Sequence, residues 1–143
     1  MKVKEIMTHP LKNISYNATI LEAAQKMDSS DVGVLPVEKR GKIVGVITDR
    51  DIVLRVIAQK LDPQNTTVDN AMTSYIISCN ENDDIEQAAK LMEENHVHRL
   101  LVHDNNKAVG ILSIGDLARK IEDDHIVHEV IREISEPVNI SYP

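Results

Sequence analysis

Aromatic residues are nearly absent from this sequence of 143 residues, which contains three Tyr and no Trp or Phe. The hydrophobic core must therefore be aliphatic, and any flat ligand would lie between Val, Ile, Leu or Met side chains. Cysteine is almost absent too. The single Cys79 excludes an internal disulfide, fits a reducing compartment, and is expected to be a small buried residue in a strand.

Long apolar segments are also missing. The N-terminal stretch MKVKEIMTHPL lacks the apolar centre of a signal peptide, and no run approaches the roughly 20 residues that cross a bilayer. Basic residues are outnumbered, and the net charge of −7 argues against nucleic acid or an anionic membrane as the main partner. With 42% hydrophobic and 27% charged residues, we expect a folded, cytoplasmic protein.

What the sequence does contain is an internal repeat. An offset of 65 positions aligns residues 3–56 with residues 68–121 without a gap, and fifteen of the aligned pairs are identical, where chance would give roughly three or four. The identical pairs include Met7/Met72, Thr8/Thr73, Ala23/Ala88, Gly45/Gly110 and Asp51/Asp116. We predict a first repeat in residues 1–61, a linker in 62–66, a second repeat in 67–122, and a C-terminal helix and tail in 123–143.

Each copy predicts the same order of elements. A short strand (residues 11–16 and 76–80) precedes a helix that opens with a capping box, from Thr19 to Glu22 and from Asp84 to Gln87. Two strands joined by a short polar turn follow, in residues 32–37 with 43–48 and in residues 97–103 with 108–113. A second helix ends the copy. The sequence therefore predicts an α+β fold of two β-α-β-β-α repeats.

A signature closes both copies: GVITDRD in residues 45–51 and GILSIGD in residues 110–116. The spacing is Gly, two aliphatic residues, Thr or Ser, two residues, and Asp. One interpretation is structural, because Thr48 with Asp51 and Ser113 with Asp116 are good signals for the start of a helix. The other is a binding site, because a carboxylate with two acceptor oxygens suits a vicinal diol.

The repeat, the element order and the signature together resemble the CBS domain family, and a tandem pair resembles a Bateman module. The resemblance implies two repeats packed with pseudo-two-fold symmetry and clefts between them that bind AMP, ADP, ATP or S-adenosylmethionine. It implies that Asp51 and Asp116 accept hydrogen bonds from ribose hydroxyls. It also implies that Thr48 and Ser113 contact ribose or phosphate. The implied function is a regulatory module that senses adenosine nucleotides and signals to an effector protein whose identity the sequence does not give.

Two further positions bear on phosphate. His98 and Arg99 lie where many family members place a His-Arg pair that grips phosphate, although they also suit a strand edge with one buried and one solvated side chain. The first copy has Gly33 and Val34 there, so the two clefts are expected to differ. Arg50 and Arg55 would supply charge to the first site, or would be solvated helix residues.

The sequence favours neither an enzyme nor a metal site. No Ser or Cys nucleophile lies in a recognisable elbow, no catalytic pair of carboxylates is apparent, and the repeats use most of the chain. His96 and His98 are predicted on one face of a strand, and His125 and His128 on one face of a helix. No cysteine or complete carboxylate set accompanies them, so no metal is predicted.

The competing function is structural: a dimerisation scaffold with degenerate clefts. The predicted helix in residues 51–61 is apolar around more than one face, which favours a homodimer under either interpretation. The C-terminal tail begins amphipathic and is predicted either to pack on the module or to contact a partner, with packing preferred.

Overall fold

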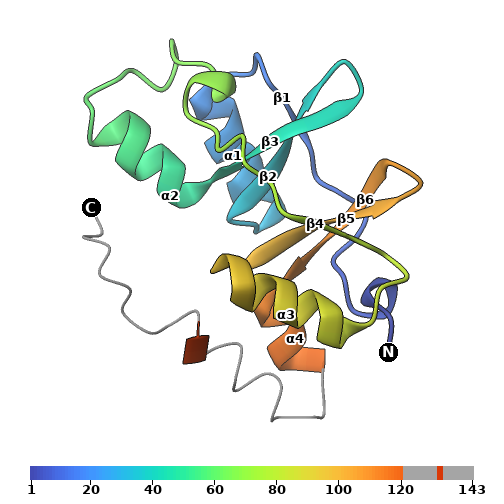
Figure 1. The fold of residues 1–143 in the computed structure, drawn as a ribbon. Helices are drawn as coiled ribbons and strands as arrows, with labels where there is room; N and C mark the ends of the chain where they lie inside the picture. Colours follow the sequence, from blue (N-terminus) through green and yellow to red (C-terminus); the bar gives the residue numbers. More distant parts are fainter. Residues whose placement is uncertain (121–131, 134–143) are drawn as a thin grey trace. The chain divides into compact units, whose positions relative to one another are not determined.

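The computed structural model describes residues 1–120 and 132–133. The predicted C-terminal segment therefore lies almost wholly outside the described residues. The rest forms two compact units, each with its own sheet, helices and hydrophobic core (Figure 1). Unit 2 is residues 12–76, and unit 1 combines residues 1–11 with the chain from residue 77 onward.

Unit 2 follows the predicted order of elements. It contains β1 (Ile14–Ser15), α1 (Ile20–Ser30), β2 (Val34–Lys39), β3 (Lys42–Thr48) and α2 (Asp49–Ile52), which continues as the π-helix η2 (Val53–Ile57). A short 3₁₀ helix, η3 (Val68–Asn70), follows. The sheet order is β1-β2-β3, with β1 parallel and β3 antiparallel to β2.

Unit 1 repeats this arrangement. It contains the 3₁₀ helix η1 (Val3–Glu5), then β4 (Ser78–Asn80), α3 (Ile85–Asn95), β5 (Arg99–Asp104), β6 (Lys107–Ser113) and α4 (Ile114–Lys120). The sheet order is β4-β5-β6 with the same strand directions. Both central strands carry an irregularity at the same repeat position, after Val37 and after Val102. The predicted α+β fold of two β-α-β-β-α repeats is confirmed.

The first helices begin where the sequence predicts. The Thr19 hydroxyl accepts from the Glu22 N–H at 3.1 Å, and the Asp84 N–H donates to Gln87 Oε1 at 3.1 Å. The apolar faces of both helices are buried in the cores, with only Ala24 partly exposed. The buried helix residues are Ile20, Ala23 and Met27 in α1, and Ile85, Ala88, Ala89 and Met92 in α3.

The first strands are shorter than predicted, and β1 is the shorter of the two. In unit 1, the Leu101 N–H donates to the Ile77 carbonyl at 3.0 Å, which supports the start of the β4 pairing. The matching residue in unit 2 is Pro36, which has no N–H to donate. The pairing therefore begins only at Ile14, opposite Val37.

The compact units and the sequence repeats do not share boundaries. Residues 2–8, which we call the N-terminal strap, belong to the first repeat in sequence but to unit 1 in the structure. Val3 and Ile6 of this strap are buried in the unit 1 core, and the Val3 N–H donates to the Asp83 carbonyl at 2.9 Å. The matching linker strap, residues 67–73, buries Val68 in unit 2. Each unit is therefore completed by the segment that precedes the other unit's main part.

Candidate functional site

The two signature turns lie where β3 meets α2 and where β6 meets α4. The Thr48 hydroxyl accepts from the Asp51 N–H at 3.0 Å, and Asp51 Oδ2 accepts from the Thr48 N–H at 3.1 Å. Ser113 and Asp116 make the same two bonds, each at 3.0 Å. The structural interpretation of the signature is therefore confirmed in both copies, because each turn is a complete capping box.

The straps bring a second hydroxyl to each signature aspartate. Thr73 Oγ1 lies 3.4 Å from both carboxylate oxygens of Asp51. Thr8 Oγ1 lies 3.3 and 3.4 Å from the two oxygens of Asp116. These distances are long for O–H···O bonds, so a single hydroxyl proton is shared weakly between two acceptors. The sequence analysis assigned no role to either threonine.

The signature glycines make room for the straps. A β-carbon added at Gly45 would lie 2.7 Å from the Thr73 carbonyl oxygen, and one added at Gly110 would lie 2.9 Å from the Thr8 carbonyl oxygen. The strap backbone runs against the strand there, with the Thr8 N–H donating to the Ile111 carbonyl at 2.8 Å. The glycine of the signature is thus required by a close backbone approach within each unit.

An arginine completes the surroundings of each aspartate, but the two arginines are held differently. Arg119 Nη2 lies 3.0 Å from Asp116 Oδ1, and its side chain is 69% exposed. Arg55 Nε lies 3.8 Å from Asp51 Oδ1, while its Nη1 donates to the carbonyls of Ala71 and Met72 at 3.1 and 3.0 Å. Arg55 therefore fastens the linker strap, whereas Arg119 pairs with the carboxylate from the surface.

Both aspartates are buried polar residues, at 9% exposure for Asp51 and 3% for Asp116. A buried carboxylate is tolerated only when its oxygens are well partnered, and here the cap, the strap hydroxyl and the arginine partner them. The result is a pair of acceptor groups fixed in orientation at the ends of β3 and β6. A bound diol would have to take over some of these existing interactions.

The surroundings of the two turns carry different charges. In unit 1 the exposed Arg99 pairs in register with Ser113, and the carbonyl of the exposed His98 accepts from the Ile114 N–H at 3.0 Å. In unit 2 the position of His98 is Gly33, where an added β-carbon would lie 3.0 Å from Asp49 Oδ2. The two copies therefore differ at these positions, with His98 and the cationic Arg99 beside the unit 1 turn and Gly33 beside Asp49 in unit 2.

The prediction that His96 and His98 lie on one face of a strand is wrong. His96 caps the end of α3 in a left-handed conformation, with φ of 51°, and His98 precedes β5, which begins at Arg99. The two residues therefore do not share a strand face. His125 and His128 lie outside the described residues. Within residues 1–120 and 132–133, no group of three or more His, Cys, Asp or Glu side chains is arranged to hold a metal ion.

The environment of His98 has a consequence for pH. Partial burial lowers the pKa of His98 below its ordinary value of 6.5, and the neighbouring Arg99 charge lowers it further. Below about pH 6.5 the unfolded chain therefore binds more protons than the folded one, and stability falls as the pH falls.

We expect His98→Gln to lose less stability than the wild type between about pH 7.5 and about pH 5.5, because the substituted side chain does not titrate. Urea unfolding of both proteins at the two pH values measures this difference. An equal loss in the two proteins would show that His98 does not contribute to the pH dependence.

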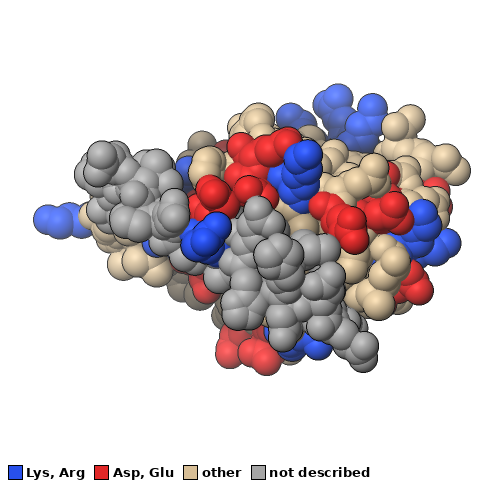
Figure 2. All heavy atoms as spheres, turned by 60° about the horizontal axis from the view of Figure 1, so that its bottom comes forward, with Lys and Arg blue, Asp and Glu red and all other residues tan. Residues whose placement is uncertain are grey.

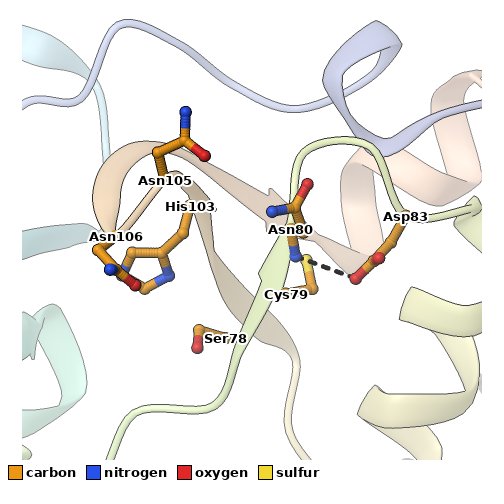
Figure 3. A pocket seen from close by; sticks show the side chains of 7 residues that line it. All are labelled: Ser78, Cys79, Asn80, Asp83, His103, Asn105 and Asn106. Carbon is orange, nitrogen blue, oxygen red and sulfur yellow. Dashed lines mark hydrogen bonds between the residues drawn. The ribbon is translucent and has the colours of Figure 1, made fainter.

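A polar hollow lies at the opposite end of the unit 1 sheet from the signature turn, beside the β5–β6 hairpin (Figure 3). Its volume is about 680 Å³. The lining residues are Ser78, Cys79, Asn80, Asp83, His103, Asn105 and Asn106. Cys79 is buried in β4, which confirms the predicted buried strand cysteine, and burial and the nearby Asp83 raise the pKa of its thiol to about 12. No Lys or Arg is among these lining residues, so the hollow offers no permanently charged group to pair with phosphate.

Among the described residues on the face that Figure 2 shows, basic side chains lie among acidic ones without forming the broad basic patch that is typical of a nucleic-acid site. None of the helices in the described part of the chain is long and apolar enough to cross a membrane.

Comparison with known proteins agrees with this geometry. The sequence profile described as CBS domain matches residues 3–58 and again residues 68–123. This chain belongs to the CBS domain family. The CBS domain-containing protein YhcV of Bacillus subtilis is 43% identical over 116 residues, covering 81% of this chain and 82% of YhcV. Hypoxic response protein 1 of Mycobacterium tuberculosis is 30% identical over 139 residues, covering 96% of each protein.

A solved structure supports the fold of the CBS pair. The crystal structure of the CBS domain protein NE2398 aligns with a TM-score of 0.76 at 32% identity, covering 83% of this chain and 95% of that one. The element order and the sheet topology described above are therefore those of a CBS pair.

Four residues around the CBS signatures were missed from the sequence: Thr8, Thr73, Arg55 as a strap fastener, and Arg119. A signal existed for the threonines, because Thr8 and Thr73 are an identical pair of the repeat. Their role was not predictable from spacing, since each lies far in sequence from the aspartate that it contacts. Arg119 gave no repeat signal, because its matching residue is Leu54.

Proposed function

We propose that this CBS-pair protein is a regulatory module that binds an adenosine nucleotide at its signature turns and passes the signal to a partner protein. CBS pairs are generally regulatory modules that bind adenosine ligands, and stand-alone CBS-domain proteins are regulatory or uncharacterised rather than catalytic. The proposed ligand class is AMP, ADP, ATP or S-adenosylmethionine. Asp51 and Asp116 would accept from ribose hydroxyls, with Thr48 and Ser113 beside ribose or phosphate.

The observation that supports this proposal best is the position of Asp116. Its carboxylate is held in one orientation by the Ser113 N–H, and it lies at the end of β6, where the sheet neighbour of Ser113 is Arg99. An acceptor fixed before binding costs less to order when a diol arrives. The adjacent Arg99 cation would favour the phosphate that follows the ribose, and the His98 ring offers a further hydrogen-bond donor.

Unit 2 supports a weaker or different interaction. It has the same buried carboxylate, Asp51, but Gly33 and Val34 replace the His-Arg pair, and Asp49 adds negative charge next to Gly33. Arg50 and Arg55 belong to this unit, and Arg55 is engaged by strap carbonyls. We therefore propose that phosphorylated ligands prefer unit 1.

A thermal-shift panel tests the proposal. The wild-type protein is heated with AMP, ADP, ATP, S-adenosylmethionine and adenosine in turn, and cyclic dinucleotides serve as a further set. A ligand at a hundred times its Kd stabilises the native state by about 2.7 kcal/mol, which corresponds to a rise of roughly 5–10 °C for a protein of this size. The absence of any shift across the panel would contradict nucleotide sensing.

A second candidate function is a structural dimerisation scaffold, because the capping boxes explain the signatures without a ligand. The structure also exposes an apolar stripe, which we define as Val53 and Ile57 on η2 together with Leu61, four residues after its end. Val53 and Ile57 are each 55% exposed. The predicted helix in residues 51–61 is corrected in its bounds: the α-helix covers Asp49–Ile52, and Val53–Ile57 is π-helical, with the Leu61 N–H donating to the Val56 carbonyl.

A second copy of the chain is the proposed occupant of the apolar stripe. Val53 and Ile57 lie about one turn apart on η2, and large exposed apolar side chains grouped on a surface are unfavourable in water unless another surface covers them. CBS-domain proteins commonly form oligomers. Homodimerisation is compatible with either candidate function, so it does not separate them.

We expect the wild type to be a dimer at micromolar concentration and the Val53→Asp, Ile57→Asp double variant to be a monomer, because two charges would enter the apolar contact. Light scattering measures both masses. The matched control is Lys60→Asp, which changes charge near the stripe at an exposed position outside it. A monomeric wild type, or a double variant that stays dimeric, would show that this stripe is not the interface.

A further inference from the structure

We propose that Arg119 is the residue by which unit 1 selects phosphorylated ligands, by exchanging its contact with Asp116 for a contact with phosphate. This inference rests on the proposed binding of an adenosine compound at the signature turn. It assigns a binding role to Arg119, for which the sequence predicted none, and it gives a reason why the two units would differ in their preference for phosphorylated ligands.

The Asp116 carboxylate can accept only a limited number of hydrogen bonds. A carboxylate has about four lone-pair sites. Oδ2 accepts from the Ser113 N–H at 3.0 Å, Oδ1 accepts from Arg119 at 3.0 Å, and Thr8 shares one hydroxyl proton between the two oxygens. A ribose diol brings two donors, so at least one present partner must give way.

Arg119 is the partner that is most easily displaced. The Ser113 N–H is a part-buried backbone group of the turn, and Thr8 is tied to Ile111 by two backbone hydrogen bonds, at 2.8 and 3.0 Å. Arg119, in contrast, has a 69% exposed side chain, and exposed ion pairs contribute little to stability. Water can solvate the displaced guanidinium immediately, whereas a displaced backbone N–H would stay unpaired.

The displaced guanidinium would remain close to the bound ligand. Its Nη1 lies 3.3 Å from where a β-carbon on Gly115 would be, so the side chain folds back over the first turn of α4. The phosphate of a 5′-nucleotide is separated from the ribose ring by a single methylene group. A planar guanidinium fork matches phosphate oxygens, so the group that leaves Asp116 can pair with the phosphate.

Unit 2 lacks this arrangement at every matching position. The repeat alignment places Gly33, Val34 and Leu54 where unit 1 has His98, Arg99 and Arg119. Its own arginine, Arg55, donates to the Ala71 and Met72 carbonyls, so displacing it from Asp51 would also loosen the linker strap. The charge-selecting exchange is therefore specific to unit 1.

The test compares adenosine with AMP. Isothermal titration of wild-type protein and the Arg119→Gln variant gives both affinities. The matched control is Lys107→Gln, which removes one positive charge from an exposed residue at the opposite end of β6 from the signature turn. We expect Arg119→Gln to weaken AMP binding at least about tenfold, because a charge-assisted contact is lost, and to leave adenosine binding unchanged or slightly tighter. Arg119→Lys, which keeps the charge but not the fork, should recover part of the AMP affinity. Lys107→Gln should change the AMP affinity by no more than about twofold.

The outcomes separate this inference from the proposed function. If neither adenosine nor AMP binds the wild type, the proposed function fails and the inference falls with it. If both bind but Arg119→Gln weakens them equally, Arg119 acts only by orienting Asp116, and the inference alone is overturned. An unchanged AMP affinity in Arg119→Gln overturns it as well. The melting midpoint of the unliganded variant, expected within about 2 °C of wild type, checks that the fold is intact.

Discussion

Gly45→Ala and Gly110→Ala are each expected to lower the free energy of unfolding by about 1–3 kcal/mol. The added methyl group would lie 2.7 Å from the Thr73 carbonyl oxygen in unit 2, or 2.9 Å from the Thr8 carbonyl oxygen in unit 1. A carbonyl of the backbone cannot rotate away like a side chain, so the strap must move off the strand. Urea unfolding followed by circular dichroism measures the loss.

Gly115→Ala is the matched control for this prediction. It makes the same substitution inside α4, where the nearest atom to the added carbon is the end of the flexible Arg119 side chain at 3.3 Å. Alanine is favoured over glycine in a helix, so this variant should gain roughly 0.5–1 kcal/mol. If Gly45→Ala and Gly110→Ala are as stable as wild type, the straps do not pack against the strands in solution as they do in the structure.

Asp116→Ala is expected to abolish most of the rise of roughly 5–10 °C that an adenosine nucleotide produces in the wild type. Two acceptor oxygens for the ribose hydroxyls disappear with the carboxylate. The unliganded variant should also be less stable by about 2–3 kcal/mol, because the part-buried Ser113 N–H and the Thr8 hydroxyl lose their partner. The informative quantity is therefore the ligand-induced shift of each variant relative to its own unliganded midpoint.

Asp51→Ala supplies the comparison within the same protein. Its carboxylate has the same capping bonds and the same strap hydroxyl, so its structural cost should be similar. If phosphorylated ligands bind in unit 1, this variant keeps most of the AMP-induced shift. An Asp116→Ala protein that retains the full shift would show that the signature aspartate is only a helix cap.

Local patterns predicted the fold well because they act over a few residues. The capping residues Thr19 and Asp84 set the helix starts, and the apolar spacing from Ile20 to Met27 set the face that is buried. Because the sequence is duplicated, each helix or strand predicted in one copy is also predicted in the other. Element ends were less predictable. Pro36 shortened β1 because it has no N–H to donate to that strand. The residues around Pro36 do not show which strand will lie beside it, so the shortening could not be predicted.

The candidate site was only half predictable for the same reason. Thr48, Asp51, Ser113 and Asp116 are close in sequence, and their mutual bonds follow from their spacing. The reason for the glycine in each signature could not be predicted from this spacing. Nothing in the spacing says which group approaches Gly45 and Gly110, and the structure places a strap there in both units.

By itself the sequence determined the α+β class, the duplicated element order, the capping boxes and the different charge of the two turns, because each depends on neighbours in the chain. Only the tertiary structure decided which segment completes which unit. It brought Thr8 to Asp116 and Thr73 to Asp51, left Arg119 exposed, and fastened Arg55 to carbonyl oxygens. These contacts join residues that are distant in the sequence, so no local pattern predicts them. The burial of Val3 and Val68 in the two cores holds the straps in place and thereby selects these contacts.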